Sequence, residues 1–539
     1  MSVVTLPNGT SNLSKEEVIT LASSAGLKLK EAHLSDWAAL LGSLDPIVNK
    51  YLEAEDYTLQ PDLTKYPRTN ISIPSTAEES DQGGWATKVT VSATSPTSDL
   101  LKGKTVAIKD NIALAGVRCT NGTEAVTWTP QIDAPIVTRI LDAGGIINGK
   151  AACENGCMEG ISDTSCTGNV HNPFAPGYSC GGSSSGSGRV VASGQAEMSI
   201  GCDQGGSIRI PASMCGLVGL KPTWGLVPYT GILSLEGTID HAGPIAKTVR
   251  DCAVLLEAIA GPDGIDDRQP AYFPEKSLEF TLGLDEFVAA AAGKEKPLAG
   301  VKVGVLEEGY QIHGMCDSVS TLCKAAVEHL ATLGAEIKSV SIPLHLSAAE
   351  IWMISLPLSG TKTALLGVTE GRKTLHMLDR APVEKLSDEQ FQKLGPGAQN
   401  LYMRYLYMKE KWGAQVHAKS HNLLRKINDA YDAVLADVDV LIMPTLPSPA
   451  CKLFDQPNEH GPLERMSRNV GMVGNTAPFN STGHPALTVP VGFVPALEDE
   501  SVKLPAGLQI VGRKFKDLDC LKVGAAWESS VDWKTFGSK

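Results

Sequence analysis

Hydrophobic and polar positions follow the periods of strands and amphipathic helices along most of this chain. Strand-like segments and helix-like segments alternate from about residue 104, and residues 301–342 give a strand, a helix and a second strand, which is a βαβ unit. This rhythm predicts an α/β fold with a mixed or parallel sheet covered by helices. The strand-like segments are 104–109, 146–150, 301–306, 336–342 and 438–443, and the helix-like ones are 134–141 and 319–333. The interval between the serines at 183 and 207 also suits a helix at 185–192 followed by a strand at 197–201.

The first 95 residues have a different pattern. Two amphipathic helical patterns span Leu13 to Leu41, where Ser14 suits an N-cap and Glu16 and Glu17 suit an acidic first turn. A polar, proline-bearing stretch from Tyr57 to Ser98 is interpreted as extended wrapping. We predict an N-terminal helical and wrapping region over 1–95, a main domain over 96–539, and within it a helical insertion at about 344–432 that covers the active site.

Composition and charge exclude several classes of protein. A chain of 539 residues with 42% hydrophobic and 20% charged residues is typical of a soluble globular protein. A net charge of -13 opposes binding to nucleic acid phosphates or to anionic membranes. No run of 18 apolar residues occurs, and the first residues lack the basic and apolar regions of a secretory signal. We therefore expect a cytoplasmic protein with no nucleic acid or membrane partner.

Cysteine spacing gives no sign of a metal site. Eight of the twelve cysteines lie between Cys119 and Cys252, yet none form C-x-x-C pairs, and the nearest approach is Cys153 with Cys157. In a reducing compartment we expect small buried residues with free thiols. No catalytic Cys–His motif is present, and no metal is expected.

Two segments are unusually rich in glycine and serine, a composition that suits the lining of a catalytic site. GGSSSGSG occupies 181–188 and DQGGSIR occupies 203–209. Glycines let a ligand approach the backbone, and hydroxyls relay protons. The match of 182–186 to the G-x-S-x-G elbow, with Ser184 as nucleophile, is weak because no apolar strand precedes it. A phosphate loop is disfavoured because Ser187 stands where its lysine belongs, and a flexible linker is disfavoured because strands and helices bracket the segment.

Three motifs in order resemble the amidase signature family. They are KDN at 109–111, GGSSSGS at 181–187 and GCDQGGSIRIPASMCGLVGLKPTWGLVP at 201–228. Similarity continues in 475–492 and 504–515, so the resemblance covers nearly everything after residue 95. DQGGSIR followed by KPTWGLVPYTG most resembles the acylamide amidohydrolases of nitrile degradation and their fungal relatives, which include carbamate-cleaving urethanases. The resemblance implies a mixed twisted β-sheet with helices on both faces.

The family resemblance assigns roles to residues. It implies that Ser207 is the nucleophile, that Ser183 relays protons from a cis peptide, and that Lys109 is the general base. It places the oxyanion hole at the backbone N–H groups of Gln204, Gly205, Gly206 and Ser207, and supporting roles at Ser184, Asp203 and Arg209. Cys202 departs from the family, since many members carry Thr there and a thiol is a weaker hydrogen-bond partner.

Lysine can deprotonate a hydroxyl only when it is neutral. We therefore expect burial to lower the pKa of Lys109 from its ordinary value of about 10.4. His171, His241 and His484 lie among the motifs, but we interpret them as structural hydrogen-bonding residues because a lysine base needs no histidine. No cofactor is required.

The expected activity is hydrolysis of small aliphatic or aromatic carboxamides through an acyl-enzyme. Carbamate hydrolysis is the main alternative, since the same triad serves it. An amidotransferase subunit for aminoacyl-tRNA and a noncatalytic scaffold are weaker alternatives. The expected partner is a small-molecule amide or carbamate, and a homodimer is left open.

Overall fold

The structure is a computed structural model that describes residues 13–537 except 126–127, 274–275, 277, 370, 377–382 and 456. The chain forms two compact units, Met1–Leu59 and Gln60–Lys539. The unit boundary therefore falls earlier than the predicted change near residue 95, and the polar stretch from residue 60 onward belongs to the large unit.

The first unit is a small helical cluster. Its helices are α1 Lys15–Ser24, η1 Glu31–His33, α2 Leu34–Gly42 and α3 Asp45–Leu52. Val18 of α1 packs against Leu34 and Ala38 of α2. The predicted N-cap is confirmed: Glu17 N–H donates to Ser14 Oγ at 3.2 Å and the Glu17 carboxylate accepts from Ser14 N–H at 2.7 Å, which is a capping box.

Twelve strands among the described residues of the second unit form one sheet, in the order β1-β2-β4-β3-β5-β7-β6-β11-β12-β10-β8-β9. Neighbours are parallel in β4-β3-β5 and β10-β8-β9 and antiparallel elsewhere. The sheet is therefore mixed, as predicted. The strands are β1 Arg68–Ser72, β2 Trp85–Ser92, β3 Thr105–Lys109, β4 Ile146–Ala151, β5 Met198–Asp203, β6 Val218–Lys221, β7 His241–Ala246, β8 Lys302–Leu306, β9 Glu336–Val340, β10 Val440–Pro444, β11 Ala486–Pro495 and β12 Lys503–Gly512.

Helices cover both faces of this sheet. The α-helices of the second unit are α4 Pro135–Asp142, α5 Ser185–Ala192, α6 Arg209–Met214, α7 Val249–Ile259, α8 Phe280–Ala291, α9 Asp317–Thr332, α10 His345–Gly360, α11 Asp388–Gln392, α12 Pro396–Lys411, α13 Ala414–Leu435, α14 Pro462–Ser467, α15 Ala477–Thr482 and α16 Asp517–Ser530. Short helical turns are η2 Asn155–Cys157, η3 Glu307–Tyr310, η4 Thr361–Leu365 and η5 Pro457–Glu459.

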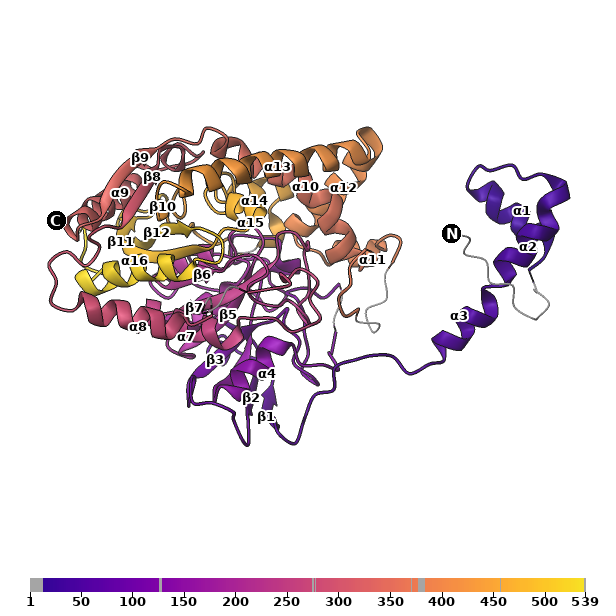
Figure 1. Cartoon of the computed structure of the whole chain (residues 1–539), viewed down its shortest axis with the longest axis horizontal. Helices are drawn as coiled ribbons and strands as arrows, with labels where there is room; N and C mark the ends of the chain where they lie inside the picture. Colours follow the sequence, from indigo (N-terminus) through magenta and orange to yellow (C-terminus); the bar gives the residue numbers. More distant parts are fainter. Residues whose placement is uncertain are drawn as a thin grey trace. The chain divides into compact units, whose positions relative to one another are not determined.

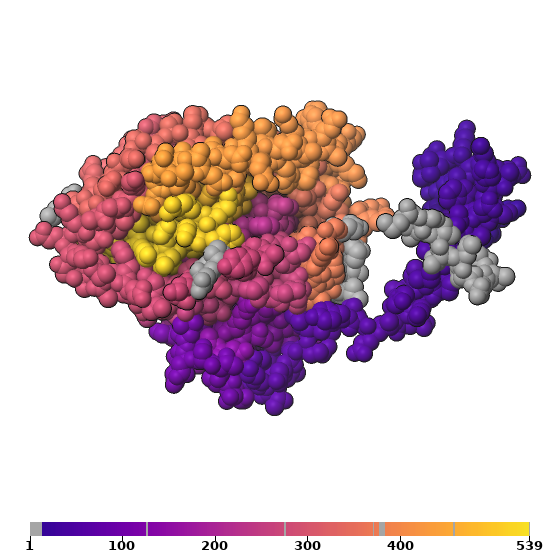
Figure 2. Space-filling model, in the orientation of Figure 1, coloured from indigo at the N-terminus to yellow at the C-terminus, as the bar shows by residue number. Residues whose placement is uncertain are grey.

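Alternation along each strand explains the two layers. In β10, Val440 and Ile442 pack in the core shared with α7, α9 and α16, whereas Leu441 and Met443 pack with α10 and α13 on the other face (Figure 1). Successive side chains of a strand point to opposite faces of the sheet, so one strand contributes side chains to both hydrophobic cores. The C-terminal segment, yellow in Figure 2, lies at the surface beside the rose-coloured segment that contains α8.

Strand β3 carries the first candidate site residue to the end of the sheet's parallel centre. Val106 and Ile108 face the α4/α7 core, while Ala107 faces the core of α5 and α6. By the same alternation Lys109, which ends β3, points to the α5/α6 face. Strand β5 pairs with β3 in parallel and ends at Asp203, so both strands deliver site residues at the same edge.

One feature of the fold differs from the sequence predictions. The stretch 57–98, expected to be extended wrapping, contributes β1 and β2, and β2 pairs with β4 inside the sheet. The sequence of β2, WATKVTVS, has a strand pattern, but polar and glycine residues flank it, so the strand was not predicted. The insertion at about 344–432 is helical, formed by α10 to α13.

Among the described residues no helix combines the length and the apolar character that crossing a membrane requires.

Candidate active site

Lys109 and Ser183 are in direct contact. Lys109 Nζ lies 2.8 Å from Ser183 Oγ and 3.3 Å from the backbone oxygen of Cys202. Both side chains are fully buried. The sequence placed these residues 74 positions apart, and the fold joins them because β3 and the loop before α5 meet on one face of the sheet.

The serine-rich segment is packed rather than flexible. The Gly182–Ser183 peptide bond is cis, and Ser184 precedes α5 at Ser185. Ser184 Oγ donates to the backbone oxygen of Cys202 and accepts from its N–H, both at 3.3 Å. The Ser184 side chain therefore joins this segment to the end of β5.

Glu154 also holds this segment in place, and it was not among the residues predicted for the site. Ser185 Oγ donates to Glu154 Oε1 at 2.6 Å, and Glu154 N–H donates to the Ser183 backbone oxygen at 3.1 Å. Burial raises the pKa of Glu154 to about 8, although hydrogen bonds from Ser185 and Thr164 lower it. An isolated acidic residue in a loop gives no sequence signal for such a role.

The buried pair of Asp203 and Arg209 brackets Ser207. Arg209 Nη2 and Nε lie 2.9 and 3.0 Å from the Asp203 carboxylate oxygens. The remaining Arg209 donors go to the Thr476 backbone oxygen and to the side chains of Gln509 and Asn480. Burial alone raises the pKa of Asp203, but the charge and hydrogen bonds of Arg209 hold it well below its ordinary value. The pair is thus fully ionised and fully hydrogen-bonded.

Each peptide unit of the loop before Ser207 is held by its carbonyl oxygen. Asn480 Nδ2 donates to the Asp203 oxygen at 2.9 Å, Trp352 Nε1 to the Gln204 oxygen at 3.0 Å, and Thr476 Oγ1 to the Gly205 oxygen at 2.5 Å. Ile210 N–H donates to the Gly206 oxygen at 2.7 Å. In a trans peptide the C=O and the next N–H point in opposite directions, so these bonds also fix the N–H directions.

Both glycines of this loop are required by its geometry. A Cβ at Gly205 would lie 2.8 Å from the Trp352 ring. Gly206 has a φ of +145°, and a Cβ there would lie 2.6 Å from Thr476 Oγ1. The Gly206 N–H donates to Asp203 Oδ1 at 2.7 Å, so this donor, assigned to the oxyanion from the sequence, is engaged within the loop.

Ser207 is the most open member of the three. Its side chain is half-buried, whereas Lys109 and Ser183 are closed off from solvent. Within the described residues its hydroxyl makes no hydrogen bond. In this structure Ser207 is therefore not joined to Ser183 or Lys109 by a hydrogen bond, but its partial exposure leaves its hydroxyl open to a ligand, which suits a nucleophile.

Three cysteine side chains surround the Lys109 amine. Desolvation lowers the pKa of Lys109, but the neighbouring sulfurs of Cys157, Cys202 and Cys153 raise it by more, so the net direction is upward. The pKa of Cys157 falls to about 6 beside Cys153 and Lys109, although burial raises it. Burial raises the pKa of Cys202 to about 12. The expectation that burial lowers the pKa of Lys109 is therefore wrong in its net direction.

The three motif histidines make structural contacts. His171 Nδ1 accepts from Gly177 N–H at 3.2 Å, and His241 Nδ1 contacts the Ile239 oxygen at 2.8 Å. His484 contacts the Thr482 hydroxyl and Asp432, each at 2.9 Å. Within the described residues none hydrogen-bonds to Lys109, Ser183 or Ser207.

All twelve cysteines are free thiols.

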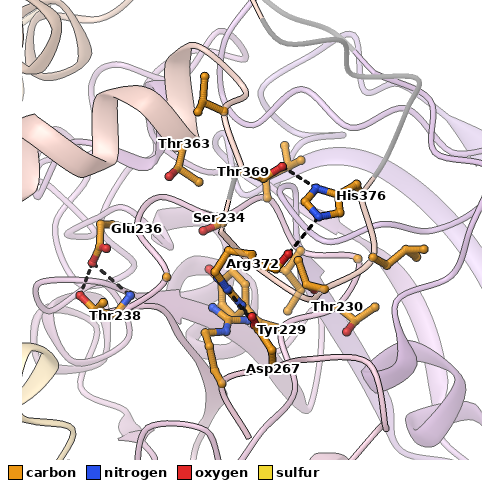
Figure 3. Close-up of a pocket in the computed structure, with 18 of the residues that line it drawn as sticks. Tyr229, Thr230, Ser234, Glu236, Thr238, Asp267, Thr363, Thr369, Arg372 and His376 are labelled. Carbon is orange, nitrogen blue, oxygen red and sulfur yellow. Dashed lines mark hydrogen bonds and ion pairs between the residues drawn. The ribbon is translucent and has the colours of Figure 1, made fainter. Parts of the chain in front are cut away.

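A cavity of about 890 Å³ lies beside the loop at 203–207 that precedes α6 (Figure 3). Tyr229 joins the two, because its hydroxyl accepts from Gln204 Nε2 at 2.7 Å. The wall at Leu233 also backs onto the KDN motif, since Leu233 N–H donates to the Asn111 oxygen. The far wall, from Thr363 to His376, belongs to the helical insertion. A cavity of this size holds a ligand larger than acetamide.

Comparison with known proteins agrees with this geometry. A family model described as Amidase matches residues 75–521. An enantioselective amidase of Rhodococcus rhodochrous is 37% identical over 506 residues, covering 91% of this chain and 93% of the relative. One component of a glutamyl-tRNA(Gln) amidotransferase, from Synechococcus sp. (strain CC9902), is 33% identical over 441 residues, covering 80% and 83%.

A solved structure supports the same assignment. The peptide amidase of Stenotrophomonas maltophilia matches with a TM-score of 0.62 at 27% identity, over 84% of this chain and 85% of that one. The family model alone spans well over half of the sequence. The chain therefore belongs to the amidase signature family and is an enzyme that hydrolyses carbon–nitrogen bonds.

Proposed function

We propose that the protein hydrolyses small aliphatic or aromatic carboxamides to a carboxylate and an amine or ammonia, through a triad of Ser207, Ser183 and Lys109. The observation that carries the proposal is the 2.8 Å contact between Lys109 Nζ and Ser183 Oγ in fully buried surroundings. A lysine amine that is buried against a hydroxyl is positioned to exchange a proton with that hydroxyl, as a proton relay requires.

In the proposed reaction, the neutral form of Lys109, which is the minor form because the pKa of its amine is raised, accepts the proton of Ser183 Oγ while Ser183 accepts the proton of Ser207. Ser207 Oγ then bonds to the amide carbon, and the carbonyl π pair moves to oxygen. When the tetrahedral intermediate collapses, the C–N bond breaks and the relayed proton is returned to the nitrogen. Water repeats the attack on the acyl-enzyme, which releases the carboxylate and regenerates Ser207.

We assign the oxyanion donors to the N–H groups of Gln204, Gly205 and Ser207. Gly206 is left out because its N–H is engaged by Asp203. The carbonyl contacts from Asn480, Trp352 and Ile210 support this assignment, since each orients the peptide unit that carries one of these donors. Donors fixed before the reaction stabilise the developing charge most effectively.

Two other activities use the same triad. Carbamate hydrolysis shares the tetrahedral intermediate and differs in its leaving group and in release of carbon dioxide. A role in an amidotransferase is favoured by the similarity to the Synechococcus protein, which is 33% identical. Glutamine-dependent ammonia release that tRNA and a partner protein stimulate would support that function over simple amide hydrolysis.

Labelling by a fluorophosphonate probe tests the proposal. We expect one labelled peptide containing Ser207, loss of labelling in Ser207→Ala, and retained labelling in Ser184→Ala. Labelling that persists in Ser207→Ala, or disappears only in Ser184→Ala, would transfer the nucleophile to another serine. Rates on acetamide, benzamide, an acyl anilide and ethyl carbamate then separate the amide from the carbamate activity.

A further inference from the structure

The cavity beside the catalytic loop has a wall of hydroxyl and charged groups. Five apolar side chains line it, but so do seven hydroxyls, two carboxylates, two guanidinium groups and one imidazole. These groups come from two loops of the core, at 224–238 and 267–268, and from the insertion (Figure 3). The polar lining residues are Tyr229, Thr230, Ser234, Glu236, Thr238, Asp267, Arg268, Thr363, Thr369, Arg372, Thr374 and His376.

Both arginines in this wall are paired with carboxylates. Arg268 contacts Asp240 at 3.2 Å and Asp266 at 2.7 Å, and it lies 4.6 Å above the Tyr229 ring. Arg372 contacts Asp266 at 3.4 Å and also Asp267. The positive groups are thus shared among three acids, and an anionic ligand would have to compete with these acids for the guanidinium groups.

Glu236 adds a further negative group to the same wall. Its Oε2 accepts from the N–H of Thr238 at 3.1 Å and from the hydroxyl of Thr238, and its Oε1 has no partner among the described residues. The side chain is only 8% exposed. When Glu236 is ionised, four carboxylates surround two guanidinium groups, which gives this wall a net negative charge.

Thr230 lies in the same wall. Its residue is 3% exposed, it lines the cavity, and its hydroxyl has no hydrogen-bond partner in the described part of the chain. The Thr230 oxygen is itself closed off from solvent, so the residue contributes to the shape of the wall, and the Oε1 of Glu236, unpaired in the part of the chain that the structure describes, is the group left to bind a ligand.

We propose that this cavity receives the part of the substrate beyond the scissile amide and selects amides that carry an ammonium group, which Glu236 binds. The inference rests on the proposed function and adds the substrate class to it. The ammonium group donates to Glu236 Oε1. A carboxylate at the same place meets a net negative wall and is rejected.

Three matched primary amides test the inference. We expect kcat/KM to fall in the order 4-(aminomethyl)benzamide, benzamide, 4-carbamoylbenzoate. The cationic substrate should exceed the anionic one by roughly tenfold or more, in the range of a hydrogen bond between charged partners. Glu236→Gln should reduce the ratio of cationic to neutral substrate toward one. Glu336→Gln, an exposed substitution on β9, should leave that ratio unchanged.

The pH dependence of the same ratio gives a second readout. Burial raises the pKa of Glu236 to about 7, so its ionised form grows between pH 6 and pH 8, and the preference for the cation should grow with it. Asp240, Arg268, Arg372 and His376 also face this region, so the comparison is made against Glu236→Gln, in which only this titration is removed. The triad affects both substrates equally and cancels in the ratio.

The outcomes separate this inference from the proposed function. Hydrolysis with equal rates on all three amides, or with the anionic one fastest, overturns the inference and leaves the triad standing. Absence of both hydrolysis and probe labelling at Ser207 overturns the proposed function itself. If Glu236→Gln fails to fold, the order of the three substrates with the unmodified enzyme still decides.

Discussion

Replacing Trp352 with Phe isolates one support of the oxyanion hole. The indole N–H of Trp352 donates to the Gln204 oxygen at 3.0 Å, and this peptide unit carries the Gly205 N–H. Phe keeps an aromatic ring against Gly205 and removes the donor. We therefore expect the loop to keep its course while the 204–205 peptide unit loses its anchor.

The size of the effect follows from the type of bond. A neutral hydrogen bond contributes about 0.5 to 1.5 kcal/mol, which corresponds to a rate change of about 2- to 13-fold. Loss of a whole oxyanion donor costs about 2.7 to 4 kcal/mol, and this sets the ceiling because Gly205 N–H itself remains. We expect a decrease of about 2- to 13-fold in kcat with little change in KM, since the oxyanion forms only in the transition state.

Steady-state kinetics and the rate of fluorophosphonate labelling should fall together, because both reactions build negative charge on the same oxygen. Trp412→Phe is the matched control, since Trp412 lies on the surface with 51% exposure. A Trp352→Phe enzyme that is folded and has an unchanged kcat would show that Trp352 does not align the loop. An effect on KM alone would make Trp352 a substrate contact instead.

Three further predictions concern the charged groups. Lys109→Ala should lower kcat/KM by roughly 10²- to 10⁴-fold, because the relay loses its base, and a smaller loss in a folded variant would point to another base. Cys157→Ala removes a thiolate that raises the pKa of Lys109, so the acid limb of the kcat/KM profile should move to lower pH; an unmoved limb would contradict this coupling. Asp203→Asn should destabilise the fold by about 3 to 5 kcal/mol at pH 7, measured by urea unfolding. Because the pKa of Asp203 is lowered in the fold, its contribution is present above its ordinary pKa of 3.8 and is lost as the pH falls below it, so the difference from the unmodified protein should shrink in acid.

Local patterns were enough to predict many of the elements that carry the site. The helix expected at 185–192 is α5 over the same residues, and the strand expected at 104–109 is β3 Thr105–Lys109. The strand was predicted from its alternation of apolar and polar residues, and the helix from the interval between Ser183 and Ser207. Strands β1 and β2 were missed because polar and glycine residues flank them, and their strand structure depends on pairing of β1 with β2 and of β2 with β4.

The surroundings of the triad could not be read from the sequence. Thr476 and Trp352 reach the catalytic loop from 271 and 148 positions away, and no short-range pattern encodes such contacts. The upward pKa of Lys109 was missed for a related reason, since Cys157 is a small residue with no motif until the fold places it beside an amine. Resemblance named the reacting residues, but the groups that hold and tune them are specific to the tertiary structure.

The long-range contacts of Arg209 bear on the stage of folding at which this enzyme becomes active. Its partner Gln509 is 300 positions farther along the chain, and Asn480 is 271 positions farther. A growing polypeptide that already holds Lys109, Ser183 and Ser207 lacks the braces that hold the loop around its nucleophile until these late segments have been made and docked. Contacts of such long range form slowly, so hydrolytic competence emerges at the close of folding, and a nascent or truncated chain stays inert toward the amides around it.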